Sequence, residues 1–401
     1  MPDIDVSIVM PCLNEFGCLA HCIANAHAAL DRLAAELGLS GEIVVADNGS
    51  TDGSQALARQ LGARVVDVPV RGYGAALLGG GRAARGRFVL MGDADGSYDF
   101  TEGVAMIASL QGGADLCMGS RFQGGIAPGA MPWKNRYIGN PVLTGLLNLM
   151  FRSGIGDAHC GLRAIRKDAL VSLRLAGTGM EFASEMVIKA ALRRLVIEER
   201  PATLSPDLRG GAPHLRPWRD GWRHLRYLFM LSPTGLFAVP ALLAMASAVL
   251  ILIASWLGTR GIIAPTFGTT WTVFAGALLG LGHLALVMAV ATHLYGVKAG
   301  YRTPHTLMIR LRDILTLETM LITGGASILG GAFGLLLVAA GWSDAGYVAL
   351  ASVLPVVLAI AAVVLGAQTV FGGFLLAVIG GNEAAFLAHG GHTADVIEFQ
   401  P

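Results

Sequence analysis

Charged residues are scarce in this chain of 401 residues, in which Asp, Glu, Lys and Arg together make up 14%. An average soluble protein contains about 25%. The shortage is also uneven, because residues 233–401 contain only 5 of the 29 Lys and Arg and 6 of the 28 Asp and Glu. Uniform burial in one globular core would not divide the charges in this way. We therefore expect a polar domain followed by a membrane domain.

Two further shortages exclude other classes of protein. The formal net charge is only +1, so the chain lacks the excess of positive charge that nucleic-acid binding requires. Five cysteines are too few for a disulfide framework, and no Cys or His cluster extends the Cys18–Cys22 pair into a zinc site. The N-terminal residues include no basic segment followed by a long apolar run. We therefore expect no signal peptide and a cytoplasmic first domain.

Short apolar runs alternate with helical stretches over residues 1–118, which is typical of a parallel sheet covered by helices on both faces. The fold class predicted for this region is therefore α/β and Rossmann-like. Two more helices are expected at about 138–151 and 181–195. The predicted strands are Val6–Met10, Ile43–Ala46, Arg64–Val68, Phe88–Met91 and Leu116–Met118.

The segment 209–232 combines arginines with aromatic residues. Four of its apolar residues are spaced as one stripe of a helix, and arginines flank that stripe. A basic helix with an aromatic face is suited to the headgroup layer of a membrane, so we predict an interfacial helix here. The stripe consists of Trp218, Trp222, Leu225 and Phe229.

Four apolar stretches follow and predict an all-α membrane domain of about four helices. Basic residues cluster before the first stretch and after the second, which predicts that both segments are cytoplasmic. The fourth stretch is too long for one perpendicular span and is expected to tilt or to continue into the interface. The stretches are Leu236–Leu257, Trp271–Tyr295, Met320–Ala340 and Tyr347–Ile379. The predicted organisation is a domain at 1–208, the interfacial helix at 209–232, spans within 233–381 with a cytoplasmic loop at 296–319, and a cytoplasmic tail at 382–401.

Polar residues follow several of the predicted strands at the point where each strand ends. Asp93 and Asp95 directly follow a buried strand, where two carboxylates are costly unless something neutralises them. A hard divalent cation bound together with a diphosphate meets that need. Asp47 ends another strand, where its carboxylate could accept hydrogen bonds from a nucleobase N–H. Both positions face the ligand crevice that parallel sheets form at this edge.

Two other phosphate-binding motifs are missing. A dinucleotide-binding domain needs G-x-G-x-x-G directly after the first strand, but Pro11 to Glu15 stand there instead. Gly72 and Gly74 come later in the chain, and Leu77 occupies the place of the third glycine. Walker A is also absent. A nicotinamide-dependent enzyme or a P-loop enzyme is therefore disfavoured.

Taken together, these motifs resemble the family 2 glycosyltransferases of GT-A fold, in particular the dolichyl- or polyprenyl-phosphate sugar synthases that carry a C-terminal transmembrane domain. The resemblance covers about residues 6–210. It implies a nucleotide-sugar donor and a polyprenyl phosphate acceptor. The motifs that carry it are Pro11 with Asn14-Glu15, Asp47 with Ser50-Thr51-Asp52-Gly53, Gly72-Tyr73-Gly74-Ala75, Asp93-Ala94-Asp95, Gly119-Ser120-Arg121, and Asp157 with Gly161-Leu162-Arg163.

The resemblance also implies roles for individual residues. Asp93 and Asp95 would hold Mg²⁺ or Mn²⁺, and Ser97 stands where related mannose synthases often have a Gln. His214 stands in place of a Lys, which makes its contact sensitive to pH. The implied nucleotide-sugar site comprises Pro11, Asn14, Glu15, Asp47, Asp93, Ala94 and Asp95. The implied acceptor or phosphate site comprises Arg121, Arg136, Arg163, Arg209 and His214.

The expected reaction is an inverting attack of the lipid phosphate on the anomeric carbon. Asp93, Asp95 and Arg121 are the expected catalytic residues. Glu181 and Glu185, one helical turn apart, are the best carboxylates if a base is required, although they could equally make polar contacts on a helix.

Three other functions stay open on the sequence alone. The chain could act on another lipid or on a polysaccharide acceptor, although no Arg-Trp dipeptide of the processive synthases occurs. It could also be a translocation partner for a glycolipid. The expected partners are the donor, the acceptor and the bilayer, and a homo-oligomer is left open.

Overall fold

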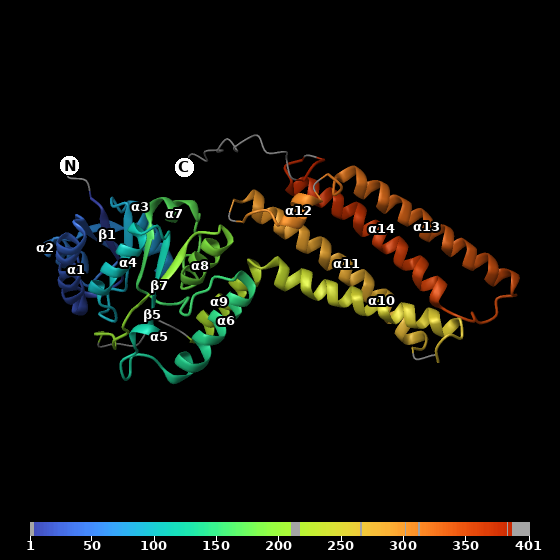
Figure 1. Ribbon diagram of the computed structural model, residues 1–401, viewed down its shortest axis with the longest axis horizontal. Helices are drawn as coiled ribbons and strands as arrows, with labels where there is room; N and C mark the ends of the chain where they lie inside the picture. The colour runs from blue at the N-terminus through green and yellow to red at the C-terminus, as the bar shows by residue number, and fades with distance from the viewer. Residues whose placement is uncertain are drawn as a thin grey trace. The chain divides into compact units, whose positions relative to one another are not determined.

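The computed structural model describes residues 4–209, 217–264, 267–300, 302–311, 313–382 and 384–386. The chain divides into two compact units, Met1–Ser232 and Pro233–Pro401. The first is built on a β-sheet and the second on helices, as the ribbon in Figure 1 shows. His214 and the tail from residue 387 onward lie outside the described residues.

Seven strands of the first unit form one sheet, in the order β3-β2-β1-β4-β6-β5-β7. Neighbouring strands are parallel except for β6, which is antiparallel to both β4 and β5. The strands are β1 (Val6–Cys12), β2 (Gly41–Asp47), β3 (Arg64–Asp67), β4 (Phe88–Met91), β5 (Leu116–Ser120), β6 (Arg163–Arg166) and β7 (Ile197–Pro201). The mostly parallel sheet confirms the α/β class, and the structure adds two strands. The sequences of β6 and β7, Arg-Ala-Ile-Arg and Ile-Glu-Glu-Arg-Pro, have no apolar run that would predict them.

Helices cover both faces of this sheet. Side chains alternate between the faces along a strand, so Ile8 packs into the core beneath α1 and α4, while Val9 faces Gly80 of α3. The helix α9 packs against α6 and α8. The helical elements of this unit are α1 (Phe16–Leu37), α2 (Ser54–Gln60), α3 (Tyr73–Ala83), η1 (Phe100–Glu102), α4 (Gly103–Gln111), α5 (Arg121–Gly124), η2 (Asn135–Gly139), α6 (Asn140–Phe151), α7 (Lys167–Ser172), α8 (Phe182–Leu192) and α9 (Pro217–Met230).

The register of the central strands brings the polar motifs to one edge. Cys12, the last residue of β1, pairs with Asp47, the last residue of β2, and Val9 pairs with Met91 at the end of β4. Because these strands are parallel, the residues that follow them emerge at the same edge of the sheet. The motifs at 14–15, 47–48 and 93–95 therefore lie next to one another, as the sequence predicts.

The second unit contains four helices long and apolar enough to span a membrane, among its described residues. This confirms the expected number. The fourth span was expected from Tyr347, but it begins at Leu354 with Pro355 in its first turn, and its 26 residues do not need an interfacial extension. The elements are η3 (Thr234–Ala238), α10 (Val239–Thr259), α11 (Thr269–Lys298), α12 (Thr306–Arg310), α13 (Leu317–Asp344) and α14 (Leu354–Ile379).

Small residues allow two of these spans to pack closely. A Cβ atom added to Gly324 of α13 would lie 2.8 Å from the carbonyl oxygen of Gly366 on α14. A Cβ atom on Gly331 would lie 2.6 Å from the carbonyl oxygen of Ala359. Glycine at these positions lets the two backbones approach each other, as is common for helices packed within membranes.

Candidate active site

A cavity of about 480 Å³ opens at the edge of the sheet where β1, β2 and β4 end. Strand ends, the start of α3, the turn before α8 and the helix α9 all contribute to its wall. Of the residues predicted to bind the nucleotide sugar, five line the cavity: Pro11, Glu15, Asp93, Ala94 and Asp95. The other lining residues are Cys12, Leu13, Asn48, Arg71, Gly72, Tyr73, Ala76, Gly179, Met180, Asp207, Arg209, Arg219 and Arg223.

Asp93 carries a buried carboxylate whose negative charge is only partly compensated. Its Oδ1 atom is buried and has no hydrogen-bond partner among the described residues. The nearby Tyr73 hydroxyl and the charges of Arg163 and Arg209 lower its pKa only in part. Burial, together with the nearby charge of Asp95, raises the pKa of Asp93 from 3.8 to about 6. An orphaned carboxylate oxygen of this kind is suited to binding a hard cation.

Asp95 is held by its own loop. Its Oδ1 atom accepts hydrogen bonds from the backbone N–H of Ser97 at 3.0 Å and from the Ser97 hydroxyl at 2.6 Å. Its Oδ2 atom lies 3.5 Å from Nη2 of Arg209. Ser97 therefore shapes the loop through Asp95, and one oxygen of Asp95 remains turned toward the positive charge of Arg209.

Arg209 also binds Glu15, through two contacts. Its Nε atom donates to Oε2 at 2.7 Å, and its Nη2 atom lies 2.5 Å from Oε1. Glu15 is only 4% exposed, so this bidentate pair neutralises a carboxylate that would otherwise be buried and charged. Arg209 is thereby fixed to the loop after β1.

Asp47 and Asn14 bind the loops around them. Both oxygens of Asp47 accept hydrogen bonds from within its own loop, from the N–H groups of Gly49 and Ser50 and from the Gln55 side chain. Asp47 is 1% exposed and does not line the cavity, so its contact with a nucleobase stays a prediction that this geometry does not support. The side chain of Asn14 accepts a bond from Thr51 N–H at 2.8 Å. The pattern of strand ends located this loop correctly but could not show which way its side chains point.

Gly72 and Gly74 make room for a neighbouring turn. A Cβ atom at Gly72 would lie 2.1 Å from the carbonyl oxygen of Thr178, and one at Gly74 would lie 2.3 Å from the carbonyl oxygen of Gly177. Ala75 N–H also donates to Thr178 O at 3.1 Å. These glycines therefore seat the turn at 177–179, which forms one wall of the cavity.

The two carboxylates considered as bases hold this same turn. Glu185 is fully buried, accepts hydrogen bonds from the N–H groups of Ala176 and Gly177, and lies 2.7 Å from Nζ of Lys189. Its oxygens are occupied by these partners and it does not line the cavity, so the role of Glu185 as a base stays a prediction that this geometry does not support. Glu181 accepts a hydrogen bond from Gly179 N–H at 3.0 Å, and its buried Oε2 atom has no hydrogen-bond partner among the described residues.

Two arginines expected to bind phosphate have protein partners instead. Arg121 forms a buried bidentate ion pair with Asp157, with Nε–Oδ2 and Nη2–Oδ1 distances both 2.7 Å. Arg163 lies in β6, is 1% exposed, and donates to the backbone carbonyls of Cys160 and Gly161. Neither lines the cavity, so a direct phosphate contact from either stays a prediction without support from the cavity lining. Arg136 lies in η2 over the ring of Tyr137 and also does not line the cavity.

Three cations in the cavity wall were not singled out as site residues from the sequence. Arg71 precedes the glycine pair at the start of α3, and Arg219 and Arg223 stand on α9. The four-residue spacing of Arg219 and Arg223 places them on one face of that helix. This spacing was the available signal, but only the packing of α9 shows that the face belongs to the cavity.

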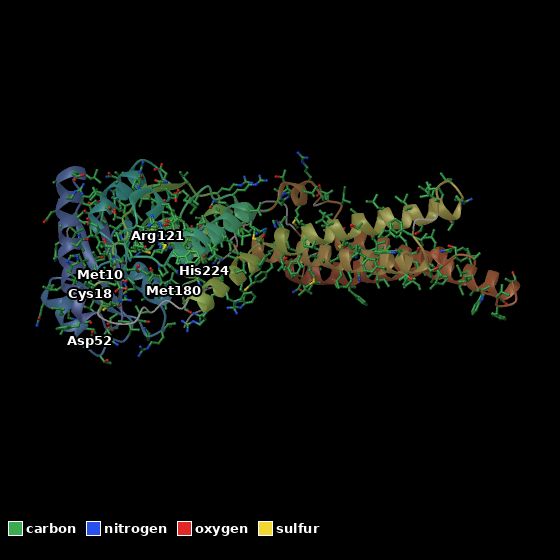
Figure 2. The ribbon with its side chains drawn as sticks, turned by 90° about the horizontal axis from the view of Figure 1, so that it is seen from below. Met10, Cys18, Asp52, Arg121, Met180 and His224 are labelled. Carbon is green, nitrogen blue, oxygen red and sulfur yellow. The ribbon has the colours of Figure 1, made fainter. Side chains whose placement is uncertain are left out.

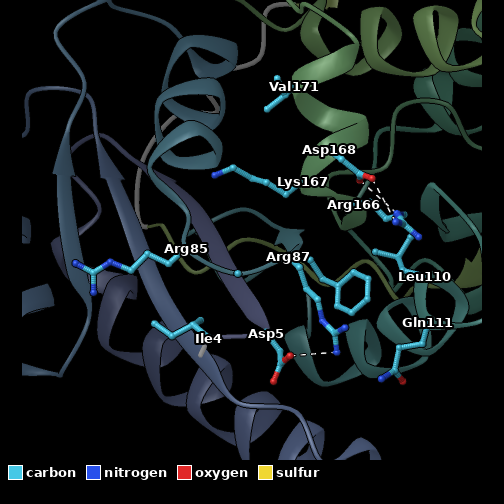
Figure 3. Close-up of a pocket in the computed structure, with 12 residues that line it drawn as sticks. Ile4, Asp5, Arg85, Arg87, Leu110, Gln111, Arg166, Lys167, Asp168 and Val171 are labelled. Carbon is cyan, nitrogen blue, oxygen red and sulfur yellow. Dashed lines mark hydrogen bonds and ion pairs between the residues drawn. The ribbon is translucent and has the colours of Figure 1, made fainter. Parts of the chain in front are cut away.

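A larger hollow of about 1060 Å³ lies at the opposite edge of the sheet (Figure 3). Its cationic side chains largely have partners. Nη2 of Arg87 lies 3.1 Å from Oδ1 of Asp5, and Nη2 of Arg166 lies 3.2 Å from Oδ2 of Asp168. The Lys167 ammonium group donates hydrogen bonds to three backbone carbonyl groups at the end of α3. These pairs stabilise that edge of the sheet. The smaller cavity, which contains Asp93 and Asp95, is therefore the better candidate for an active site.

Comparison with known proteins adds two family matches. Residues 7–174 match the model described as glycosyl transferase family 2, and residues 290–380 match the family 2 C-terminal transmembrane region. A hexosyltransferase of low-salt glycan biosynthesis from Haloferax volcanii is 39% identical over 379 residues, which cover 94% of this chain and 89% of that protein.

Two further relatives match about half of this chain. A dolichyl-phosphate hexose transferase from Haloferax volcanii is 28% identical, with 54% of this chain and 89% of that protein covered. A polyprenol monophosphomannose synthase from Mycolicibacterium smegmatis is also 28% identical, with 49% of this chain and 76% of that protein covered.

Proposed function

The chain belongs to glycosyltransferase family 2, and from that premise we propose that it transfers a hexose from a nucleoside diphosphate sugar to a polyprenyl phosphate at a membrane surface. The observation that carries the proposal is the composition of one cavity. Asp93 and Asp95 stand in its wall together with Arg71, Arg209 and the arginines of α9. Such a cavity can hold a metal-bound diphosphate beside a second phosphate group.

The carboxylates fit Mg²⁺ or Mn²⁺. Asp93 offers a buried oxygen without a hydrogen bond, and both residues supply hard oxygen donors. No cluster of three or more His, Cys, Asp or Glu side chains suited to a metal occurs in the part of the chain that the structure describes, so substrate oxygens and water would complete the coordination. When bound, such an ion stabilises negative charge on a departing diphosphate.

The surface around α9 supports the proposal that the acceptor is a lipid phosphate. Its Trp222 is 61% exposed, and α6 and η2 beside it also present exposed apolar side chains. Exposed apolar groups flanked by arginines are typical of a surface that contacts lipid headgroups. Arg219 and Arg223 line the cavity from this same helix, and in our proposal they bind the phosphate of the lipid acceptor. The exposed residues of η2 and α6 are Tyr137, Ile138, Val142 and Leu149.

The chemistry needs no strong base in the protein. A phosphate monoester has a second pKa of about 6 and is therefore largely dianionic at neutral pH. In our proposal its oxygen forms a bond to the anomeric carbon as the bond from that carbon to the diphosphate oxygen breaks. The nucleoside diphosphate leaves with the electron pair, and the single displacement inverts the anomeric carbon. Arginines of the wall orient both phosphates, and Glu181 positions the turn at 177–179.

The proposed location is the cytoplasmic face of a membrane crossed by four spans. The basic residues before the first span and after the second favour this orientation. Nucleotide sugars are then available to the cavity, and the acceptor tail remains in the bilayer.

The proposal is tested with the full chain in detergent, supplied with labelled UDP-glucose, GDP-mannose or UDP-N-acetylglucosamine. We expect one donor to label undecaprenyl or dolichyl phosphate, and mass spectrometry to identify a polyprenyl-monophosphate hexose. The corresponding polyprenol, which lacks the phosphate, should remain unlabelled. Labelled polysaccharide, or movement of a preformed glycolipid without synthesis, would support the competing functions instead.

Arg223→Gln is expected to weaken binding of the lipid phosphate acceptor rather than binding of the nucleotide-sugar donor. Losing a charged hydrogen bond to phosphate costs about 1.5–3 kcal/mol, so the KM for polyprenyl phosphate should rise about 10- to 100-fold. The KM for the nucleotide sugar should change less than about twofold. Arg59→Gln, at an exposed arginine of α2 that does not line the cavity, is the matched control. Equal effects on both substrates would contradict the assignment.

A further inference from the structure

Two cysteine thiols lie directly behind the loop that carries Asp93 and Asp95. Cys18 and Cys22 are four residues apart on α1, so they lie on the same face of that helix. Each is 2% exposed, and Figure 2 labels Cys18 within the first unit. The proposed reaction uses neither of them.

The thiols contact the backbone of the carboxylate loop. The Cys18 sulfur lies 3.2 Å from the carbonyl oxygen of Ala94, the residue between the two aspartates. It also lies 3.3 Å from Oε2 of Glu15, the partner of Arg209. The backbone N–H of Gly96, which follows Asp95, lowers the pKa of the Cys22 thiol against the larger effect of burial. Cys18 therefore holds the loop between the two aspartates through Ala94.

Both groups remain neutral thiols at physiological pH. Burial raises the pKa of Cys18 to about 12, with a further contribution from its hydrogen bond to Glu15. Burial likewise raises the pKa of Cys22 to about 12, with Asp95 the next cause. A neutral S–H group can donate to a carbonyl without adding negative charge beside two carboxylates.

We propose that Cys18 is a positioning residue that fixes the spacing of Asp93 and Asp95 for a divalent cation, by binding the backbone at Ala94, and that Cys22 supports it from the same face of α1. This inference rests on the proposed function, because it assigns the cation to this loop. Cys18 has the more direct role, since its contacts join the loop to the Glu15–Arg209 pair.

The experiment measures Mn²⁺ binding by the full chain in detergent, using the electron paramagnetic resonance signal of free Mn²⁺ and no substrate. Cys18→Ala removes the donor, and Cys18→Ser retains one. We expect Cys18→Ala to raise the dissociation constant for Mn²⁺ about fivefold or more, and Cys18→Ser to stay within about twofold of the unsubstituted chain. Cys22→Ala should give a smaller rise.

Cys117→Ala is the control for simple loss of packing. Cys117 is a fully buried thiol in β5, which β6 separates from β4 in the sheet. Thermal unfolding is recorded for every variant. If Cys18→Ala binds Mn²⁺ normally, if Cys18→Ser is as weak as Cys18→Ala, or if Cys117→Ala weakens binding equally, the positioning role is overturned. If the unsubstituted chain binds no Mn²⁺, the proposed metal site itself fails, which is a distinct result.

Discussion

Asp95→Asn is expected to lower sugar transfer by about 10²- to 10³-fold while the protein still folds and inserts into the membrane. The substitution removes one negative charge but keeps an oxygen that can accept the hydrogen bonds from Ser97. Electrostatic stabilisation of a leaving diphosphate contributes several kcal/mol, and about 3–4 kcal/mol corresponds to this loss of rate. Single-turnover transfer from labelled donor to polyprenyl phosphate measures the effect.

Asp67→Asn provides the matched control for the loss of charge. Asp67 ends β3 at the same edge of the sheet, is exposed, and does not line the cavity. Its substitution should leave transfer within about twofold of normal. If Asp95→Asn retained more than about half of the activity, the assignment of Asp95 as a metal ligand would be wrong.

Asp157→Asn is expected to cause the largest loss of stability. Arg121 and Asp157 are 9% and 0% exposed at their side chains, so removing the carboxylate leaves a guanidinium charge buried without compensation. Breaking such a pair typically costs about 3–5 kcal/mol. At about 2–4 °C per kcal/mol for a unit of this size, the apparent Tm of the first unit should fall by about 6–20 °C. Intrinsic fluorescence of the full chain in detergent during heating provides the measurement.

An exposed ion pair shows how much of that loss comes from burial. Arg32 and Glu36 form an i,i+4 pair on α1, and their side chains are 49% and 47% exposed. Because solvent screens this pair, Glu36→Gln should change the free energy of unfolding by less than about 0.5 kcal/mol. Similar shifts for the two variants would refute a structural role for the Arg121–Asp157 pair. If Asp157→Asn lost activity without losing stability, the result would support a direct contact of Arg121 with a substrate phosphate.

The general organisation was predictable from the sequence. The uneven distribution of charge predicted two different parts of the chain, and the family matches and four apolar helices support that division. The short apolar runs predicted β1 to β5, because strands buried on both faces need continuous apolar residues. β6 and β7 were missed because their many charged residues resemble surface segments.

The sequence likewise predicted some features of the candidate site and not others. Sequence motifs found the loops after β1, β2 and β4, because parallel strands bring their carboxyl ends to one edge. They could not show that Asp47 turns into its own loop, or that Glu185 binds a turn and Lys189. Those outcomes depend on which N–H groups and cations lie within about 3 Å, and sequence spacing does not contain that information.

By itself, then, the sequence determined the fold class, the number of spans and the loop that carries the paired aspartates, because periodicity and local charge express them directly. Only the tertiary structure decided which arginines face the cavity. Arg121 and Arg163 are bound by a carboxylate and by backbone carbonyls, whereas Arg71, Arg219 and Arg223 line the wall. An arginine is chemically the same in each setting, and its role is fixed by the partners that folding brings within reach of its guanidinium group.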